Sequence, residues 1–214
     1  MSNRDLSNAV FEKDLPRVKE LIRDGVSMDC TDTSIRHPLF CALIDSDPIR
    51  IKICKRLIKA GINVNALDND ETLLLLLSSD ECGDLPSKYR VRLVKLLLAY
   101  SAALDIQDRH GYTALMNAIN SRQYKIACLL INAGANVNLK TINCLDSALD
   151  CALHNMLHYN KPADIAILQL LLAKNVHIPR KLKNSPLIEF ARLKGELVQL
   201  KATIRACNVC RQHR

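Results

Sequence analysis

One stretch decides the fold: Asp108-Arg-His-Gly111-Tyr-Thr113-Ala-Leu115-Met-Asn-Ala118, followed by Ile126-Ala-Cys-Leu-Leu130-Ile-Asn-Ala-Gly134-Ala-Asn136-Val-Asn138. Thr113 suits the start of a short helix, because its hydroxyl can accept a hydrogen bond from a free backbone N–H of the first turn. Apolar residues in the second segment follow helical spacing and predict an inward-facing stripe. Gly134 suits the left-handed turn that ends such a helix. The stretch therefore predicts a turn, a short inner helix, a second outer helix and a glycine turn, in that order.

Weaker copies of this order recur along the chain. The residues that would end the outer helices are Gly25, Gly61, Ser101, Gly134 and Asn175, at spacings of 36, 40, 33 and 41. Each follows an apolar run of helical spacing, at 18–22, 53–58, 91–98, 126–131 and 165–172. Thr72, Ser147 and Ser185 stand where Thr113 does, and Asp14 and Asp47 suit the starts of outer helices.

This pattern resembles the ankyrin repeat, strongly at 106–138 and more weakly over nearly the whole chain. The resemblance implies an all-α fold, an ankyrin-repeat solenoid of stacked helix-turn-helix units with short hairpin-like turns. We expect one domain over residues 1–214, with units at about 2–30, 31–65, 66–105, 106–138 and 139–177 and a basic C-terminal capping unit at 178–210.

The copies depart from the family in two ways. The family's Thr-Pro-Leu-His tetrapeptide is nowhere intact, and the residues in place of its histidine are Phe40, Leu75, Met116, Asp150 and Ile188. We therefore expect neighbouring units to hold one another mainly by apolar contact. Two units are long, and the extra polar, proline-containing residues at 79–87 and roughly 154–162 are expected to form surface loops.

The composition favours a soluble protein inside a cell, cytoplasmic or nuclear. Hydrophobic residues make up 49% of the chain, enough for a core. The longest apolar block, at 73–77, is far shorter than a membrane span. Nine scattered cysteines, an odd number, favour reduced thiols over a disulfide framework. Effectors that bacteria or viruses direct into host cells also use degenerate, long-looped ankyrin repeats, so a host-cell location is included.

Positive charge is concentrated at the C-terminal end. Residues 178–214 hold nine Lys and Arg against two carboxylates, whereas the preceding residues hold 21 against 20. This segment predicts a polar cap on the stack. The alternative is a contact with nucleic-acid phosphates or an acidic partner, although no aromatic residue follows Phe190 to stack on bases.

Two clusters suggest chemistry, and both have plainer explanations. His154 and His158 are one helical turn apart, but Asn155 stands where a zinc peptidase has its catalytic glutamate. Cys207 and Cys210 with His213 provide fewer than the four ligands that structural zinc needs. We expect no catalytic residue, no bound metal and no cofactor.

In the ankyrin family, hairpin tips and exposed sides of inner helices line the partner-binding groove. The resemblance places twelve residues on that surface: Asn69, Asp70, Ser79, Asp80, Arg109, His110, Tyr112, Asn120, Ser121, Asn143, His154 and Asn155. Arg109 and Tyr112 are the expected anchors, because Tyr and Arg often dominate binding energy. The sequence therefore predicts a non-catalytic module or adaptor, monomeric when free, that binds another protein.

Overall fold

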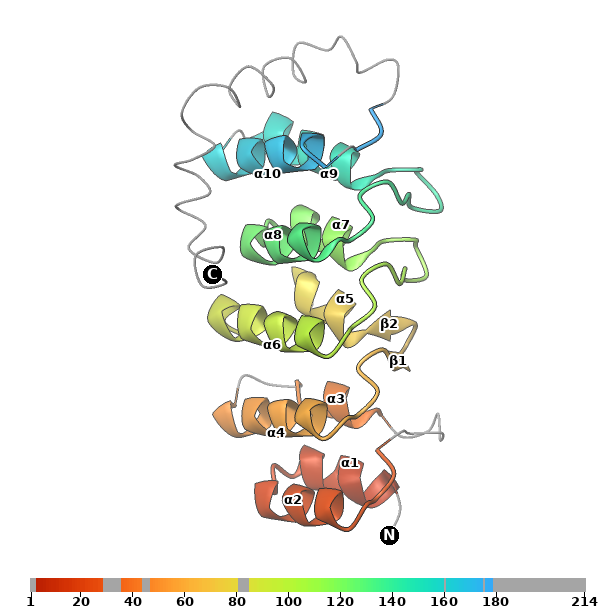
Figure 1. Cartoon of the computed structure of the whole chain (residues 1–214), viewed down its shortest axis with the longest axis vertical. Coiled ribbons are helices and arrows are strands. Elements are labelled where there is room, and N and C mark those ends of the chain that lie inside the picture. Colours follow the sequence, from red (N-terminus) through yellow and green to blue (C-terminus); the bar gives the residue numbers. More distant parts are fainter. Residues whose placement is uncertain are drawn as a thin grey trace. The chain divides into compact units, whose positions relative to one another are not determined.

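The computed structural model describes residues 3–28, 36–43, 47–80, 85–159, 161–174 and 176–178 (Figure 1). These residues form two compact units, unit 1 up to Arg109 and unit 2 from His110 onward. Each unit is built from pairs of short helices, an inner helix followed by an outer one. The predicted capping unit lies outside the described residues except for Ile178, so its structure stays a prediction.

Unit 1 contains three helix pairs. They are α1 (Asn3–Phe11) with α2 (Leu15–Arg23), α3 (Pro38–Cys41) with α4 (Pro48–Lys59), and α5 (Leu73–Ser78) with α6 (Ser87–Ala99). The outer helices α2, α4 and α6 pack side by side in that order, and α1 packs on α3. The predicted runs at 18–22, 53–58 and 91–98 all lie inside outer helices.

A small hairpin precedes α5. Strands β1 (Leu67–Asp68) and β2 (Glu71–Thr72) pair antiparallel, with Leu67 opposite Thr72 and Asp68 opposite Glu71. Asn69 and Asp70 form the two-residue turn with φ of 51° and 63°. Positive φ at both positions suits the twist of a tight hairpin, and Asn and Asp tolerate it better than most residues. The short hairpin-like turn predicted from the sequence is therefore present here.

Unit 2 contains two helix pairs. They are α7 (Ala114–Asn120) with α8 (Tyr124–Ala133) and α9 (Ala148–Tyr159) with α10 (Pro162–Leu172). Helix α9 packs on α7 and α10, and α10 also packs on α8. The predicted loop at roughly 154–162 is wrong over most of its length, because α9 continues to Tyr159. His154 and His158 lie on the exposed face of this helix, and its opposite face, with Leu153, Asn155 and Met156, is buried.

The predicted helix boundaries agree closely with the structure. Asp14 and Asp47 cap α2 and α4 by accepting backbone N–H bonds. Thr72 and Thr113 do the same for α5 and α7, each over 3.3 Å. Gly134 ends α8 with φ 95°, a left-handed conformation that glycine adopts without a side-chain clash.

Leucine, isoleucine, valine and alanine form the core of each unit. In α5 the side chains of Leu73, Leu74, Leu75 and Leu77 are almost completely buried, and the outer helix α6 packs against this short helix. In unit 2, Leu115, Ile119 and Leu130 are inaccessible to solvent. Thin helical layers hold such apolar residues only when they are stacked, so neighbouring pairs stabilise each other.

Buried arginines add polar links that the sequence analysis did not predict. Arg50 on α4 donates to the carbonyls of Val10 and Phe11, at 3.2 and 2.8 Å, and of Cys41 at 2.9 Å. Arg90 on α6 donates to the carbonyls of Leu85 and Ser79, at 3.0 and 2.8 Å. Carbonyls in the last turn of a helix have no intrahelical donor. These guanidinium groups supply one, so apolar contact is not all that joins the layers.

Candidate partner-binding surface

A tight loop at Lys140–Ser147 forms one tip of unit 2. Lys140 and Ser147 form an antiparallel bridge at its base. Within it, the Thr141 N–H donates to the Asp146 carbonyl over 2.9 Å, and the Asp146 N–H donates to the Thr141 hydroxyl oxygen over 3.0 Å. The loop is therefore held in one shape, and its outermost residues, 142–145, project into solvent.

Two large apolar side chains stand on this tip. Ile142 is 64% exposed and Leu145 is 63% exposed. Leu145 also has φ of 57°, a left-handed conformation that is uncommon for a residue other than glycine, asparagine or aspartate. Both exposure to water and backbone strain are unfavourable for a leucine.

The preceding tip, at 110–112, touches this loop through its backbone. The Ile142 N–H donates to the His110 carbonyl over 3.0 Å. Gly111 permits the approach, because a Cβ built on it would lie 2.6 Å from the Ile142 nitrogen. The two tips thus form one continuous surface within unit 2, which we call the tip surface (residues 110–112 and 141–147).

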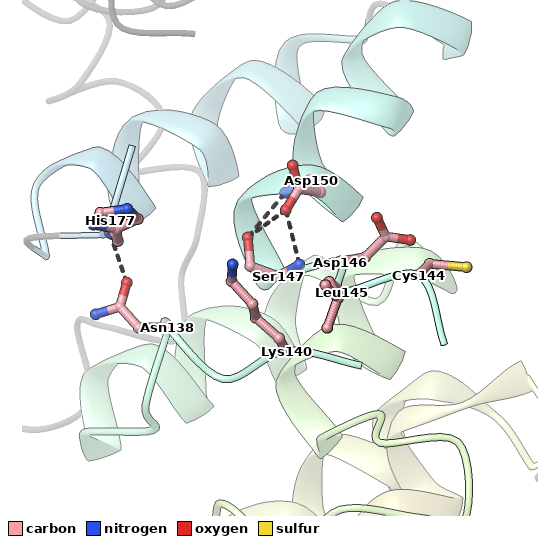
Figure 2. A pocket seen from close by; sticks show the side chains of 8 residues that line it. All are labelled: Asn138, Lys140, Cys144, Leu145, Asp146, Ser147, Asp150 and His177. Atoms are coloured by element: carbon pink, nitrogen blue, oxygen red, sulfur yellow. Dashed lines mark hydrogen bonds between the residues drawn. The ribbon is translucent and has the colours of Figure 1, made fainter. Parts of the chain in front are cut away.

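An open depression adjoins the tip surface (Figure 2). It is lined by Asn138, Lys140, Cys144, Leu145, Asp146, Ser147, Asp150 and His177. Asp150 accepts bonds from the N–H and the hydroxyl of Ser147, at 2.8 and 2.6 Å, and the Asn138 side-chain oxygen accepts the His177 N–H at 2.6 Å. The depression has a volume of about 200 Å³, below the roughly 300 Å³ at which pockets for drug-sized ligands begin. Its size suits one side chain of a partner.

The twelve predicted partner-facing residues are placed as follows. In unit 2, His110, Asn120, Asn143 and His154 are exposed, and Tyr112 and Ser121 are half-buried. In unit 1, Asn69, Asp70, Asp80 and Arg109 are exposed, and Ser79 is half-buried. The tip surface brings His110, Tyr112 and Asn143 together. Their role in binding stays a prediction.

Asn155 is the exception, and its predicted exposure is wrong. The residue is 3% exposed, and its side-chain amide donates to the Ile119 carbonyl over 2.6 Å. Ile119 lies in the last turn of α7, where backbone carbonyls need an external donor. Asn155 therefore joins α9 to α7 and is not available to a partner.

His154 and His158 are both exposed on α9, with ring centroids 4.2 Å apart. Within the described ranges, no three His, Cys, Asp or Glu side chains are grouped so that they could hold a metal ion. Cys207, Cys210 and His213 lie outside those ranges.

A second polar cluster in unit 2 is structural. Arg122, in the turn before α8, donates to the Tyr124 hydroxyl over 2.8 Å and lies over the Tyr159 ring at 4.2 Å. Tyr124 in turn donates to the Asp164 carboxylate, which also caps the first turn of α10 by accepting the Lys161 N–H over 2.8 Å. Burial, assisted by the bond to Asp164, raises the pKa of Tyr124 to about 12. The buried carboxylate thus joins α10 to α8, and Arg122 extends the cluster to Tyr159 of α9.

Cys144 on the tip and Cys151 on α9 differ in reactivity. Cys151 is 5% exposed, and burial, together with Asp146 and Asp150, raises its pKa to about 12. Its thiol therefore stays protonated and unreactive at neutral pH. Cys144 is exposed at the rim of the depression, where a reagent or a partner can reach it.

Sequence reasoning missed the apolar residues of the tips. Ile142 and Leu145 in unit 2, and Leu67 on the hairpin of unit 1, are exposed by more than half, although hydrophobic residues are ordinarily assigned to the core. A signal was present, because Thr141-Ile-Asn-Cys-Leu-Asp146 falls between two predicted helices and outside their apolar stripes.

A family model described as ankyrin repeats, in three copies, matches residues 87–141. The match begins at α6 and runs through the α7–α8 pair to the tip surface, and the other helix pairs follow the same inner–outer order. Residues 87–141 therefore match ankyrin repeats, and the fold class is an all-α repeat solenoid. Ankyrin repeats generally mediate protein–protein interaction, and proteins built from them are generally non-catalytic. No helix of the described ranges is long and apolar enough to cross a membrane.

Proposed function

We propose that this chain is a non-catalytic adaptor that binds a partner protein, and that in unit 2 the contact is made by the tip surface and the adjoining depression. The observation that carries the proposal is the pair of exposed apolar side chains, Ile142 and Leu145, on a tip that hydrogen bonds hold in one shape. A rigid surface loses little conformational entropy when a partner binds, so apolar area buried there contributes directly to affinity.

The chemistry around the two apolar residues suits a protein partner. Asn143 and His110 offer hydrogen-bonding groups beside them, and Tyr112 lies half-buried on the neighbouring tip. Protein interfaces commonly combine a few apolar or aromatic anchors with a polar rim. Asn120 and His154 extend the same proposal along the inner helices α7 and α9. In unit 1, Asn69, Asp70, Ser79, Asp80 and Arg109 are proposed as further contacts.

Variants of the tip test the proposal. Ile142→Asn/Leu145→Asn replaces both apolar side chains by polar ones. Asparagine is common in loops and adopts the positive φ of position 145 more readily than most residues. Anchors at the centre of an interface contribute about 2 kcal/mol or more, so the double variant should bind the partner at least roughly 30-fold more weakly. The partner is first captured with the unaltered chain, and the dissociation constants are then measured by calorimetry.

The matched control is Ile49→Asn/Tyr100→Asn, which removes two exposed apolar side chains from outer-helix ends in unit 1. We expect this control to bind the partner as the unaltered chain does. Equal affinity of the tip variant and the control variant would sink the proposal.

The alternative is a contact made by residues 178–214 with nucleic acid or an acidic partner. Those residues, apart from Ile178, lie outside the described ranges, so the alternative rests on their charge alone. A location inside a cell, in the cytoplasm, the nucleus or a host cell, is likewise inferred from the scattered, odd number of cysteines.

A further inference from the structure

The outer helices of unit 1 are unusual in charge. Helices α4 and α6 together carry nine Lys and Arg and no carboxylate: Arg50, Lys52, Lys55, Arg56, Lys59, Lys88, Arg90, Arg92 and Lys95. The single carboxylate within α2 is Glu20, which pairs with Arg17 over 2.6 Å. In unit 2 the outer helices differ, because α8 carries only Lys125 and α10 only Asp164.

The net charge of unit 1 does not reveal this separation of cations from carboxylates. Carboxylates in unit 1 gather in turns and tips, such as Asp68, Asp70 and Glu71, and at helix caps such as Asp14 and Asp47. Helices α4 and α6 therefore present one sign of charge while the whole unit stays close to neutral. Like charges on adjacent helices repel each other, so their accumulation is unfavourable for the isolated protein.

Seven of the nine cations point outward. Arg50 and Arg90 are buried and donate to backbone carbonyls, as described above. The others are exposed or half-buried on two helices that pack directly on each other: Lys52, Lys55, Arg56, Lys59, Lys88, Arg92 and Lys95. We call these seven residues the outer basic face. None of the ion pairs in the described part of unit 1 involves them.

We infer that the outer basic face binds a nucleic-acid duplex through its phosphates, without reading the base sequence. From Lys52 to Lys59 the helix rises about 10 Å, and neighbouring helices lie about 8–10 Å apart. A duplex carries one charge per about 1.7 Å of axis, or about six over 10 Å. The number and spread of the cations are therefore comparable with the charge of a short duplex segment, part of which faces the protein.

Other polyanions fit this face less well. Single strands need aromatic side chains for base stacking, and on α4 and α6 only Tyr89 offers a ring, half-buried and beneath Lys88 at 4.9 Å. Anionic membranes bind interfacial helices chiefly through an apolar face, and Ile49 is the one large apolar side chain exposed on these two helices. The helices lie flat against their neighbours, so neither can enter a groove to contact base edges.

Fluorescence anisotropy with a labelled 24-base-pair duplex of random sequence tests the inference on the full chain. If five to seven phosphates are contacted, the affinity should fall on the order of 10³-fold between 50 and 200 mM salt. Lys52→Gln/Arg56→Gln/Lys88→Gln should weaken binding on the order of 100-fold at 100 mM salt and reduce the logarithmic salt slope by about three.

Two comparisons complete the experiment. Arg4→Gln/Lys125→Gln/Lys174→Gln removes the same number of exposed cations elsewhere and should change affinity less than about threefold. Arg180→Gln/Lys181→Gln/Lys183→Gln tests the C-terminal segment and should also have a small effect. Vesicles containing phosphatidylserine should sediment little of the chain.

The inference is overturned if the outer-face variant binds the duplex as tightly as the Arg4 variant does. It is equally overturned if the Arg180 variant alone loses binding, or if vesicles but not duplexes are bound through Lys52, Arg56 and Lys88. Circular dichroism spectra of the variants should superimpose on that of the unaltered chain, because all the substituted outer-face residues are exposed.

Discussion

Arg50→Ala is expected to lower the free energy of unfolding by roughly 3 kcal/mol, which is large for one residue of a thin helical layer. The side chain is 4% exposed and donates to three carbonyls at the ends of α1 and α3. Removing it leaves acceptors in a site that water reaches poorly, and each such acceptor costs about 1–3 kcal/mol. Urea unfolding followed by circular dichroism gives the change.

Two further variants separate the hydrogen bonds from the charge. Lys52→Ala, on the exposed side of the same helix, should change the stability by less than about 0.5 kcal/mol. Arg50→Lys keeps the charge but replaces the planar fork by a single ammonium group, so it should recover only a minor part of the loss. The account of Arg50 is wrong if the lysine variant is as stable as the unaltered chain.

Gly111→Ala should destabilise the chain by about 2–3 kcal/mol and separate the two tips. At φ 84° an alanine is strained, and its Cβ would lie 2.6 Å from the Ile142 nitrogen. Because the contact is with backbone, the tip must move and the bond from Ile142 to the His110 carbonyl must lengthen. Urea unfolding measures the loss, and faster hydrogen exchange of the Ile142 amide reports the broken bond.

Gly134→Ala is the matched control, since Gly134 has φ 95° and an alanine Cβ at this position would have no atom within 4 Å. It should show the conformational strain alone, about 1 kcal/mol. Equal losses for the two variants would mean that the contact between the tips contributes nothing to stability.

The helix order could be predicted from the sequence because local signals agree with one another. Apolar runs, capping residues such as Asp47 and Thr113, and the turn at Gly134 each indicate the same boundaries. The predicted loop in the fifth repeat was wrong for a local reason as well. Proline at 162 and exposed polar residues suggested a break, but α9 reaches Tyr159 before the chain turns.

The site was less predictable, because side-chain exposure depends on register and length. The resemblance places Asn155 on the exposed side of an inner helix, but this helix, α9, has 12 residues, whereas the inner helix α7 has 7. The Asn155 amide therefore meets the end of α7 at the Ile119 carbonyl. For Ile142 and Leu145 the error has the opposite sign. Apolar residues are ordinarily assigned to the core, and only the paired geometry of the tip shows that these two face water.

The distribution of charge over the surface was likewise not predictable from the sequence. Counting over the whole chain places the positive surplus at 178–214 and makes the rest nearly neutral. The outer basic face appears only when residues are assigned to helices and to the outward side of each helix. Helices that are neighbours in space bring Lys52 and Arg92 onto one surface although they are far apart in the sequence.

Site-specific crosslinking tests most directly whether the tip surface of unit 2 is where a partner protein binds. A photoreactive residue is placed at Cys144 on the tip or at Lys125, which is exposed on the outer helix α8. The captured partner is then added to each full-length chain. We predict adducts between chain and partner from position 144 and none from position 125. Adducts from position 125 alone would contradict the account.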